Sequence, residues 1–533
     1  MHPAEIIVGL LTAVAVLVTA SRRLGLPYPI VLVLGGLALG FVPGLPHVAL
    51  PPDLVLIAFL PPLLFAESVT FSWRDLLANA RPIGLLALGL VLMTMAAVAA
   101  VAHAIVPELP WAAAFALGAI VAPTDPVAAA AIAKRLGLPQ QLLVILTGES
   151  LINDATSLVA YRLAVVAAVS GVFSPAAAAG EFVLSSLGGV ALGLAVGFVL
   201  AQVRQRMLPD PPVENTISLL SPFAAYLPAE ALHVSGVLAV VAMGLYLGRQ
   251  GSRYLSATTR LQGTALWSMV DFLLNGLLFI LVGLQLRPIL DGIAGHHPGR
   301  LLWHGILVSL TVIAARLVWV FTAVYLPRLL RRHGGAGDPY PSWRPILVVA
   351  WTGMRGGISL AAALALPLTV AGGQPFPQRS LLLFLTFAVI LSTLIVQGLS
   401  LPLLISRLAL PKDETAAQEV NQTRRRVAQS ALDYLADASP QSTGLPQKLL
   451  DSQQEYWTRK TALLTAREQG QPQEESEAKT LAFRRLRRAL IDTQRSTAIG
   501  LRDDSTISDG VLQDVQRALD LEEQRLILEE EDT

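Results

Sequence analysis

Two short polar stretches interrupt long apolar runs and carry the residues best suited to bind an ion. Residues 122–128 read APTDPVA, so that Thr124 and Asp125 lie between Pro123 and Pro126. Two prolines three residues apart remove two backbone donors and clash with preceding carbonyls, so a helix must break there. A broken helix leaves carbonyl oxygens free beside a hydroxyl and a carboxylate, which favours a cation site.

The second polar stretch lies in the next apolar run, which reads LTGESLINDATSLVAYRLA. Ser150 and Asp154 are four residues apart and therefore share one face of a helix. Glu149 is five residues before Asp154, about 140° around a helix of 3.6 residues per turn, and so faces elsewhere. A short loop makes the two runs antiparallel neighbours with their acids at comparable depth. The sequence therefore predicts one cluster, formed by Thr124, Asp125, Ser150 and Asp154.

This cluster suits the exchange of a cation for a proton. Oxygen ligands suit hard cations, and a carboxyl group removed from water holds a proton more readily. One site that binds either species is sufficient for antiport. Residues 411–533 contain no G-x-x-x-x-G-K-[ST] motif for ATP, which favours a secondary transporter over a pump.

The composition places these residues in a membrane. The chain has 533 residues, of which 53% are hydrophobic and 14% charged, whereas soluble domains carry about a quarter charged residues. A soluble enzyme is therefore excluded, and a formal net charge of +1 argues against a nucleic-acid partner. The absence of cysteine excludes disulfides, thiolate metal sites and cysteine nucleophiles.

The charges divide the chain into two domains. Residues 1–410 hold 22 Lys and Arg and 15 Asp and Glu, whereas residues 411–533 hold 17 and 23. We expect a transmembrane domain over 1–410 and a helical cytoplasmic tail over 411–533, regulatory or oligomeric in role, whose ligand or partner the residues do not identify.

An all-α polytopic membrane protein with about thirteen spanning helices is predicted from the apolar runs. They lie near 4–20, 28–43, 52–68, 82–106, 110–133, 141–169, 176–203, 214–232, 234–248, 264–286, 301–327, 343–368 and 379–406. Loops after the odd-numbered runs, with the junction to the tail, carry 16 basic residues, and the other loops carry 3. The positive-inside rule then places the N-terminus outside and the tail in the cytoplasm.

A second break is predicted where Gly353, Gly356 and Gly357 surround Arg355. Interrupted helices at corresponding positions of two halves indicate inverted repeats, here runs 1–6 and 8–13. Arg355 is then the expected ion-pair partner of Glu149. The alternative is that Arg355 caps carbonyls of its own break.

Other intramembrane charges rank lower as site candidates. Asp271 and Asn275 share a helical face and are interpreted as a polar packing pair. Arg316 is expected to pair with an acidic neighbour or to reach the interface. Arg162 lies two turns outward of Asp154 and is a candidate for tuning ion entry, and Glu230 is expected at the interface.

Several motifs together resemble the bacterial sodium/proton exchangers of the monovalent cation:proton antiporter-1 family. They are FLPPLLFAES (59–68), APTDPVA (122–128), RLGLP with GESLINDA (135–155), VSGVLAVVAMGLYLG (234–248) and GMRGGISLAAALALP (353–367). The resemblance covers roughly residues 5–410. It implies thirteen helices, with a core domain that moves against a dimerisation domain in a homodimer.

The resemblance also implies roles for single residues. Asp154 is the carboxylate that carries the cation and the proton, and Asn153 stands where electrogenic relatives have Asp, which suggests electroneutral exchange. Thr124 and Asp125 stabilise or coordinate the site, and Ser150 offers a hydroxyl. Many relatives have Glu directly after the PPLLF string, where this chain has Ala66 followed by Glu67, so Glu67 is a further candidate one residue later. The resemblance implies Na⁺ as the ion bound at Asp154, Asp125, Ser150 and Thr124.

The sequence thus predicts an electroneutral antiporter in a bacterial inner membrane that exchanges cytoplasmic Na⁺ or Li⁺ for external H⁺. It is expected to be no enzyme and to need no cofactor. Potassium/proton exchange is the near alternative, because oxygen ligands alone do not determine cation size. A cation channel gated by the tail is the remote one.

Overall fold

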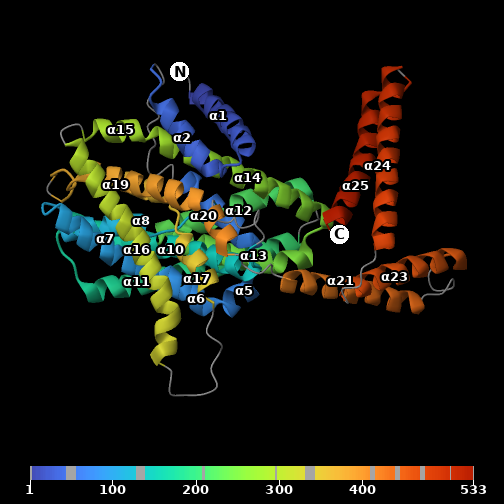
Figure 1. The fold of residues 1–533 in the computed structure, drawn as a ribbon, viewed down its shortest axis with the longest axis horizontal. Helices are drawn as coiled ribbons and strands as arrows, with labels where there is room; N and C mark the ends of the chain where they lie inside the picture. Colours follow the sequence, from blue (N-terminus) through green and yellow to red (C-terminus); the bar gives the residue numbers. More distant parts are fainter. Residues whose placement is uncertain are drawn as a thin grey trace. The chain divides into compact units, whose positions relative to one another are not determined.

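The computed structural model describes residues 3–43, 56–127, 138–206, 210–293, 297–330, 342–371, 373–408, 414–437, 444–468, 474–504 and 506–531. They form helices and, within these ranges, no strand (Figure 1). The chain divides into two compact units, Met1–Lys412 and Asp413–Thr533. Lys134, Arg135, Arg331 and Arg332, which were counted for the predicted orientation, lie outside the described residues.

The first unit contains the apolar helices. They are α1 (Pro3–Leu24), α2 (Tyr28–Gly40), α4 (Leu60–Thr70), α5 (Trp73–Ala78), α6 (Ala80–Gly84), η1 (Leu85–Leu90), α7 (Val91–Ile105), α8 (Trp111–Val121), α10 (Gln140–Ser170), α11 (Pro175–Arg206), α12 (Pro211–Ala231), α13 (Gly236–Tyr254), α14 (Ala257–Leu284), α15 (Leu286–Asp291), α16 (Pro298–Leu330), α17 (Trp343–Trp351), α18 (Gly357–Leu364), α19 (Arg379–Ser392), η2 (Thr393–Gln397) and α20 (Gly398–Leu408). The elements η1 and η2 are π-helical turns inside longer helices.

Seven helical stretches within the described ranges are long and apolar enough to cross a membrane. They are Glu5–Leu24, Ala80–Ile105, Gln140–Ser170, Pro175–Arg206, Ala257–Asp291, Pro298–Leu326 and Arg379–Leu408. Shorter apolar helices cover Tyr28–Gly40, Leu56–Thr70 and Trp111–Val121. The chain is therefore a multi-pass membrane protein, and large apolar side chains on α11 such as Leu184 and Leu187 are exposed as lipid contact requires.

Glycines let several of these helices approach closely. A Cβ atom on Gly193 of α11 would collide with the carbonyl of Ala239 on α13, and one on Gly283 of α14 with the carbonyl of Val33 on α2. Small residues at such contacts are typical of membrane helices, whose association depends on close packing because lipid is as apolar as the side chains. The helix pairs α11–α13 and α2–α14 are accordingly packed along their lengths.

The second unit consists of two helical hairpins. Helix α21 (Glu414–Ala436) lies beside α23 (Gln447–Glu468), and α24 (Glu474–Asp503) lies beside α25 (Asp509–Glu531) (Figure 1). Ile491, Leu519 and Leu526 form the small buried core of the second hairpin. Arg495 adds ion pairs across it, at 2.8 Å to Asp520 and 2.7 Å to Glu523.

Candidate functional site

Helices are interrupted at both places where the sequence predicts a break. Helix α8 ends at Val121 and residues 122–125 are not helical, while α17 ends at Trp351 and α18 begins at Gly357. The two interruptions meet, because the backbone N–H of Asp125 donates to the carbonyl of Met354 at 2.9 Å. We refer to residues 122–125 and 352–356 as the crossing.

Side chains satisfy the carbonyls that the first interruption releases. Ser150 Oγ donates to the carbonyl of Thr124 at 3.0 Å, and Arg355 Nη1 donates to that of Ala122 at 2.6 Å. Non-helical backbone at membrane depth is tolerated only where such partners or a watery cavity surround it. The proline pair breaks the helix, and these donors make the break stable.

Thr124 connects the crossing to α10. Its hydroxyl donates to Glu149 Oε1 at 3.1 Å and accepts from Asn153 Nδ2 at 2.7 Å. Glu149 and Asn153 are each 1% exposed. Asn153 Oδ1 has no hydrogen-bond partner in the part of the chain that the structure describes.

The predicted ion pair between Glu149 and Arg355 is wrong in its partner. Arg316 of α16 donates hydrogen bonds to Glu149 from both terminal guanidinium nitrogens, from Nη1 to Oε1 and from Nη2 to Oε2, the latter at 2.8 Å. Arg316 also donates to the carbonyl of Val349 from Nε and Nη2, at 3.2 and 3.0 Å. Both members of the pair are 1% exposed. Spacing shows only that Glu149 faces away from Asp154, and the packing of α16 decides which arginine it meets.

Arg355 instead joins the two interruptions. Besides its bond to Ala122, its backbone N–H donates to Thr393 Oγ1 in the π-helical turn η2 at 3.1 Å. The alternative prediction was that Arg355 caps a carbonyl of its own interruption. Arg355 does cap a carbonyl, but that carbonyl belongs to Ala122 in the first interruption. Its side chain is fully buried, which places a positive charge at the crossing.

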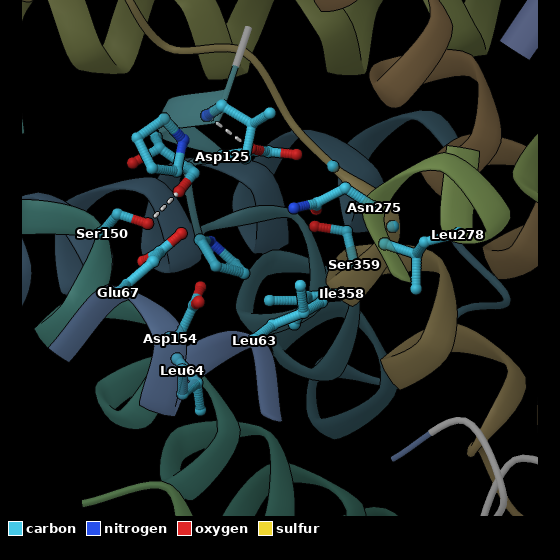
Figure 2. A pocket seen from close by; sticks show the side chains of 16 residues that line it. Leu63, Leu64, Glu67, Asp125, Ser150, Asp154, Asn275, Leu278, Ile358 and Ser359 are labelled. Atoms are coloured by element: carbon cyan, nitrogen blue, oxygen red, sulfur yellow. Dashed lines mark hydrogen bonds between the residues drawn. The ribbon is translucent and has the colours of Figure 1, made fainter. Parts of the chain in front are cut away.

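A small inner cavity of about 30 Å³ lies against the crossing. Thr124, Asp125, Ser150 and Asp154 line it together with Glu67 of α4 (Figure 2). That volume is about the space of one water molecule, and it suits a cation that has shed its hydration shell. The structure thus brings together the four residues of the predicted cluster and the further candidate, Glu67.

Asp154 and Asp125 occupy different surroundings in this cavity. Asp125 Oδ1 accepts the backbone N–H of Val127 at 2.8 Å, and its carboxylate lies where a Cβ on Gly356 would be. Asp154 is 4% exposed, and none of its described neighbours donates a hydrogen bond to its carboxylate. Asp125 is thereby positioned by backbone, whereas Asp154 is left to interact with what enters the cavity.

A wider cavity of about 640 Å³ lies next to the inner one. Glu67, Pro126 and Val127 line both cavities, so the two adjoin there. The wider one runs past Arg204 at the end of α11 and the exposed Arg260 near the start of α14. It therefore reaches the surface on the side where basic residues gather.

Three residues that line these cavities were not predicted as site residues. Asn275 and Ser359 line the inner cavity, and Asp271 lines the wider one. Asn275 Nδ2 donates to Asp271 Oδ1 at 2.9 Å, so the predicted polar pair exists, yet it faces the cavities. The pattern that could have identified it is an acid and an amide four residues apart in an otherwise apolar membrane helix.

Arg162, the candidate for tuning entry, lies apart from the inner cavity. It forms an ion pair with Glu230 of α12, at 2.5 and 2.6 Å to the two carboxylate oxygens. No three His, Cys, Asp or Glu side chains gather into a tight metal-binding group among the described residues. The polar residues that line the inner cavity carry carboxyl, hydroxyl and amide groups.

A family model described as the transmembrane part of sodium/hydrogen exchangers matches residues 9–407. The chain belongs to the sodium/hydrogen exchanger family. Members of this family transport ions and are not enzymes.

Two of the relatives described here match this exchanger along nearly its whole length, and a third matches three quarters of it. An uncharacterized Na⁺/H⁺ exchanger of Mycobacterium tuberculosis is 38% identical over 526 residues, which cover 98% of this chain and 96% of that protein. One from Escherichia coli is 32% identical over 543 residues, covering 98% of each. A sodium, potassium, lithium and rubidium/H⁺ antiporter of Bacillus subtilis is 35% identical over 410 residues, covering 75% of this chain and 61% of that one.

The fold of the exchanger resembles that of a solved antiporter. The sodium proton antiporter of Methanocaldococcus jannaschii superposes with a TM-score of 0.60 at 20% identity, covering 76% of this chain and 98% of that one. The membrane unit is thus an antiporter-type helical fold.

Proposed function

We propose that this exchanger is an electroneutral antiporter that takes up external H⁺ and expels cytoplasmic Na⁺ or Li⁺ by alternating access. The observation that carries the proposal is the inner cavity, where Asp154 faces space for one dehydrated ion with Asp125, Ser150 and Thr124 around it. Asp154 binds either the cation or a proton, and these two states alternate across the membrane.

The charge balance of α10 supports a one-for-one exchange. The helix has two acids, Glu149 and Asp154. Glu149 is neutralised by Arg316, and Asn153, beside Asp154, is uncharged and bonded to Thr124. One carboxylate of α10 is thus left to titrate, and replacing its proton by one monovalent cation moves no net charge.

The test is transport by purified protein in liposomes. A pH gradient, acidic inside, should dissipate when Na⁺ is added, at a rate that does not change when the membrane voltage is clamped with valinomycin and K⁺. A rate that follows the voltage would refute electroneutrality. A current without a pH gradient, far above carrier turnover, would indicate the channel instead.

Potassium/proton exchange is the second candidate, and the relative from Bacillus subtilis, whose name includes potassium and rubidium, favours testing it. Oxygen ligands accept all alkali cations. Comparing Na⁺, Li⁺, K⁺ and Rb⁺ in the same liposomes decides between the two, and activation by K⁺ at lower concentration than by Na⁺ would overturn the sodium assignment.

We also propose thirteen spans arranged as two inverted repeats, in a homodimer in the bacterial inner membrane, with the N-terminus outside and the tail cytoplasmic. The basic residues gathered on one side support this orientation. Because the chain has no cysteine, single cysteines report topology cleanly. In intact cells, an impermeant maleimide should label Arg300→Cys and leave Arg74→Cys unlabelled, and the reverse pattern would invert the orientation.

A further inference from the structure

Asp271 and Asn275 lie where the two cavities adjoin, on the side that α14 provides. They are one helical turn apart, and the 2.9 Å hydrogen bond from Asn275 Nδ2 to Asp271 Oδ1 holds them together. Asp271 lines the wider cavity and Asn275 lines the inner one. This pair therefore spans the passage between the surface-reaching cavity and the site of Asp154.

The passage has a carboxylate on a second element as well. Glu67 of α4 lines both cavities. Figure 2 shows Asn275 across the inner cavity from Glu67 and Ser150. A cation that moves from the wider to the inner cavity thus passes between oxygen atoms of α4 and α14.

An unsatisfied hydroxyl in the inner cavity indicates that a ligand belongs there. Ser359 of α18 is 1% exposed and lines this cavity, yet its Oγ has no hydrogen-bond partner among the described residues. Buried hydroxyls nearly always have a partner. An ion in the cavity would supply one, on the side away from α10.

We propose that Asp271 and Asn275 form an entry station for the transported cation, from which it moves into the inner cavity and gains Ser359 Oγ as a ligand. This proposal rests on the proposed exchange function. The carboxylate of Asp271 attracts the cation out of the wider cavity, whose lining also includes Arg204 and Arg260. It thereby raises the local cation concentration beside the inner cavity, where the carboxyl group of Glu67 also lies. Oxygen atoms of Asp271 and Asn275, and then those of the inner cavity, replace the water molecules of the cation's hydration shell one after another.

The central test is Asp271→Asn, which removes the charge and keeps an oxygen that accepts the hydrogen bond from Asn275. Na⁺-driven proton movement is measured in everted vesicles, where the cytoplasmic face is outside. We expect the KM for Na⁺ to rise about three- to ten-fold with the maximal rate little changed, because the carboxylate of Asp271 is one of several charges that attract the ion. Asp271→Glu should restore the KM.

The matched control is Asp291→Asn. Asp291 lies on α15, is exposed and lines neither cavity, so the same chemical change there should leave the KM unaltered. A second readout separates charge from structure. Choline chloride should raise the KM of the wild type toward that of Asp271→Asn, because salt screens the attraction, and should affect the variant less.

The outcomes separate the station from the transport function. Absence of Na⁺-driven exchange in the wild type would refute both. Normal wild-type exchange with an unchanged KM in Asp271→Asn, or with a loss confined to the maximal rate, would refute the station alone. Ser359→Ala should also raise the KM for Na⁺, and an unchanged KM there would remove Ser359 from the ligand set.

Discussion

Removing one partner of the Glu149–Arg316 ion pair leaves the other charge buried, and the two removals differ in what the remaining side chain can do. Both side chains are 1% exposed. In Glu149→Gln, Arg316 keeps the carbonyl of Val349 but cannot lose its proton. In Arg316→Met, Glu149 keeps the hydrogen bond from the hydroxyl of Thr124 and can take up a proton.

The size of the effect follows from these remaining options. Breaking a buried pair costs about 3–5 kcal/mol. Over the 412 residues of the membrane unit, at ~2 cal/mol/K per residue, this corresponds to a fall of about 4–6 °C in Tm. A buried carboxylate that loses its partner can give up its charge by binding a proton, so Arg316→Met has an escape that Glu149→Gln lacks.

The pH dependence distinguishes the two variants. Each unit by which pH falls makes protonation of a carboxylate cheaper by about 1.4 kcal/mol. The Tm of Arg316→Met should therefore approach that of the wild type between pH 8 and pH 5. The deficit of Glu149→Gln should persist, because its unpaired arginine stays charged throughout.

The assay is thermal unfolding in detergent across this pH range, with a double-mutant cycle. Glu149→Gln with Arg316→Met should be more stable than the sum of the single losses by about 2 kcal/mol. The comparison cycle of Glu149→Gln with Arg355→Met should show a smaller coupling. Additive losses at Arg316, with the coupling found at Arg355, would refute the pairing and restore the partner expected from sequence.

Three further predictions concern the site and the tail. Asp154→Asn should fold normally and lower Na⁺-driven exchange about 100-fold or more, and exchange at the wild-type level would remove Asp154 as the carrier. Gly356→Ala should impair exchange because its Cβ displaces the carboxylate of Asp125, whereas Gly84→Ala, with open space around its Cβ, should not; equal activities would contradict this reading of the crossing. A variant that ends at Lys412 should still exchange ions in liposomes, and complete loss would show that the tail is needed for transport.

Local rules were sufficient to predict the parts of the site that depend on chain chemistry. The proline pair at 123 and 126 and the glycines around Arg355 favour an interruption of the helix, and both interruptions are present. Helical spacing placed Ser150 and Asp154 on one face, and both line the inner cavity. It did not predict that Glu149, on a neighbouring face, also contacts the crossing through Thr124. These inferences use only neighbours within about two turns of the chain.

Contacts between distant helices could not be predicted in the same way. Arg316 and Arg355 are both buried arginines, and spacing within α10 does not say which of them lies opposite Glu149. The same limit applies to Asn275 and Ser359, whose facing toward the cavity depends on how α14 and α18 are rotated. A polar residue in an apolar helix indicates that it has a buried partner. Which residue is that partner depends on how the helices pack.

Two hydrogen bonds join the backbone interruptions to each other, one from the N–H of Asp125 to the carbonyl of Met354 and one from the side chain of Arg355 to the carbonyl of Ala122. Hydrogen bonds inside a protein are strengthened by the low local dielectric, so these two bonds hold the interruptions together. If the unit that contains them travels as one piece, the spacing of the oxygens along it is carried unchanged from one membrane face to the other. The ion would then be bound by the same arrangement of oxygens at both membrane faces. The site would therefore rank the alkali cations in the same order in both directions of transport.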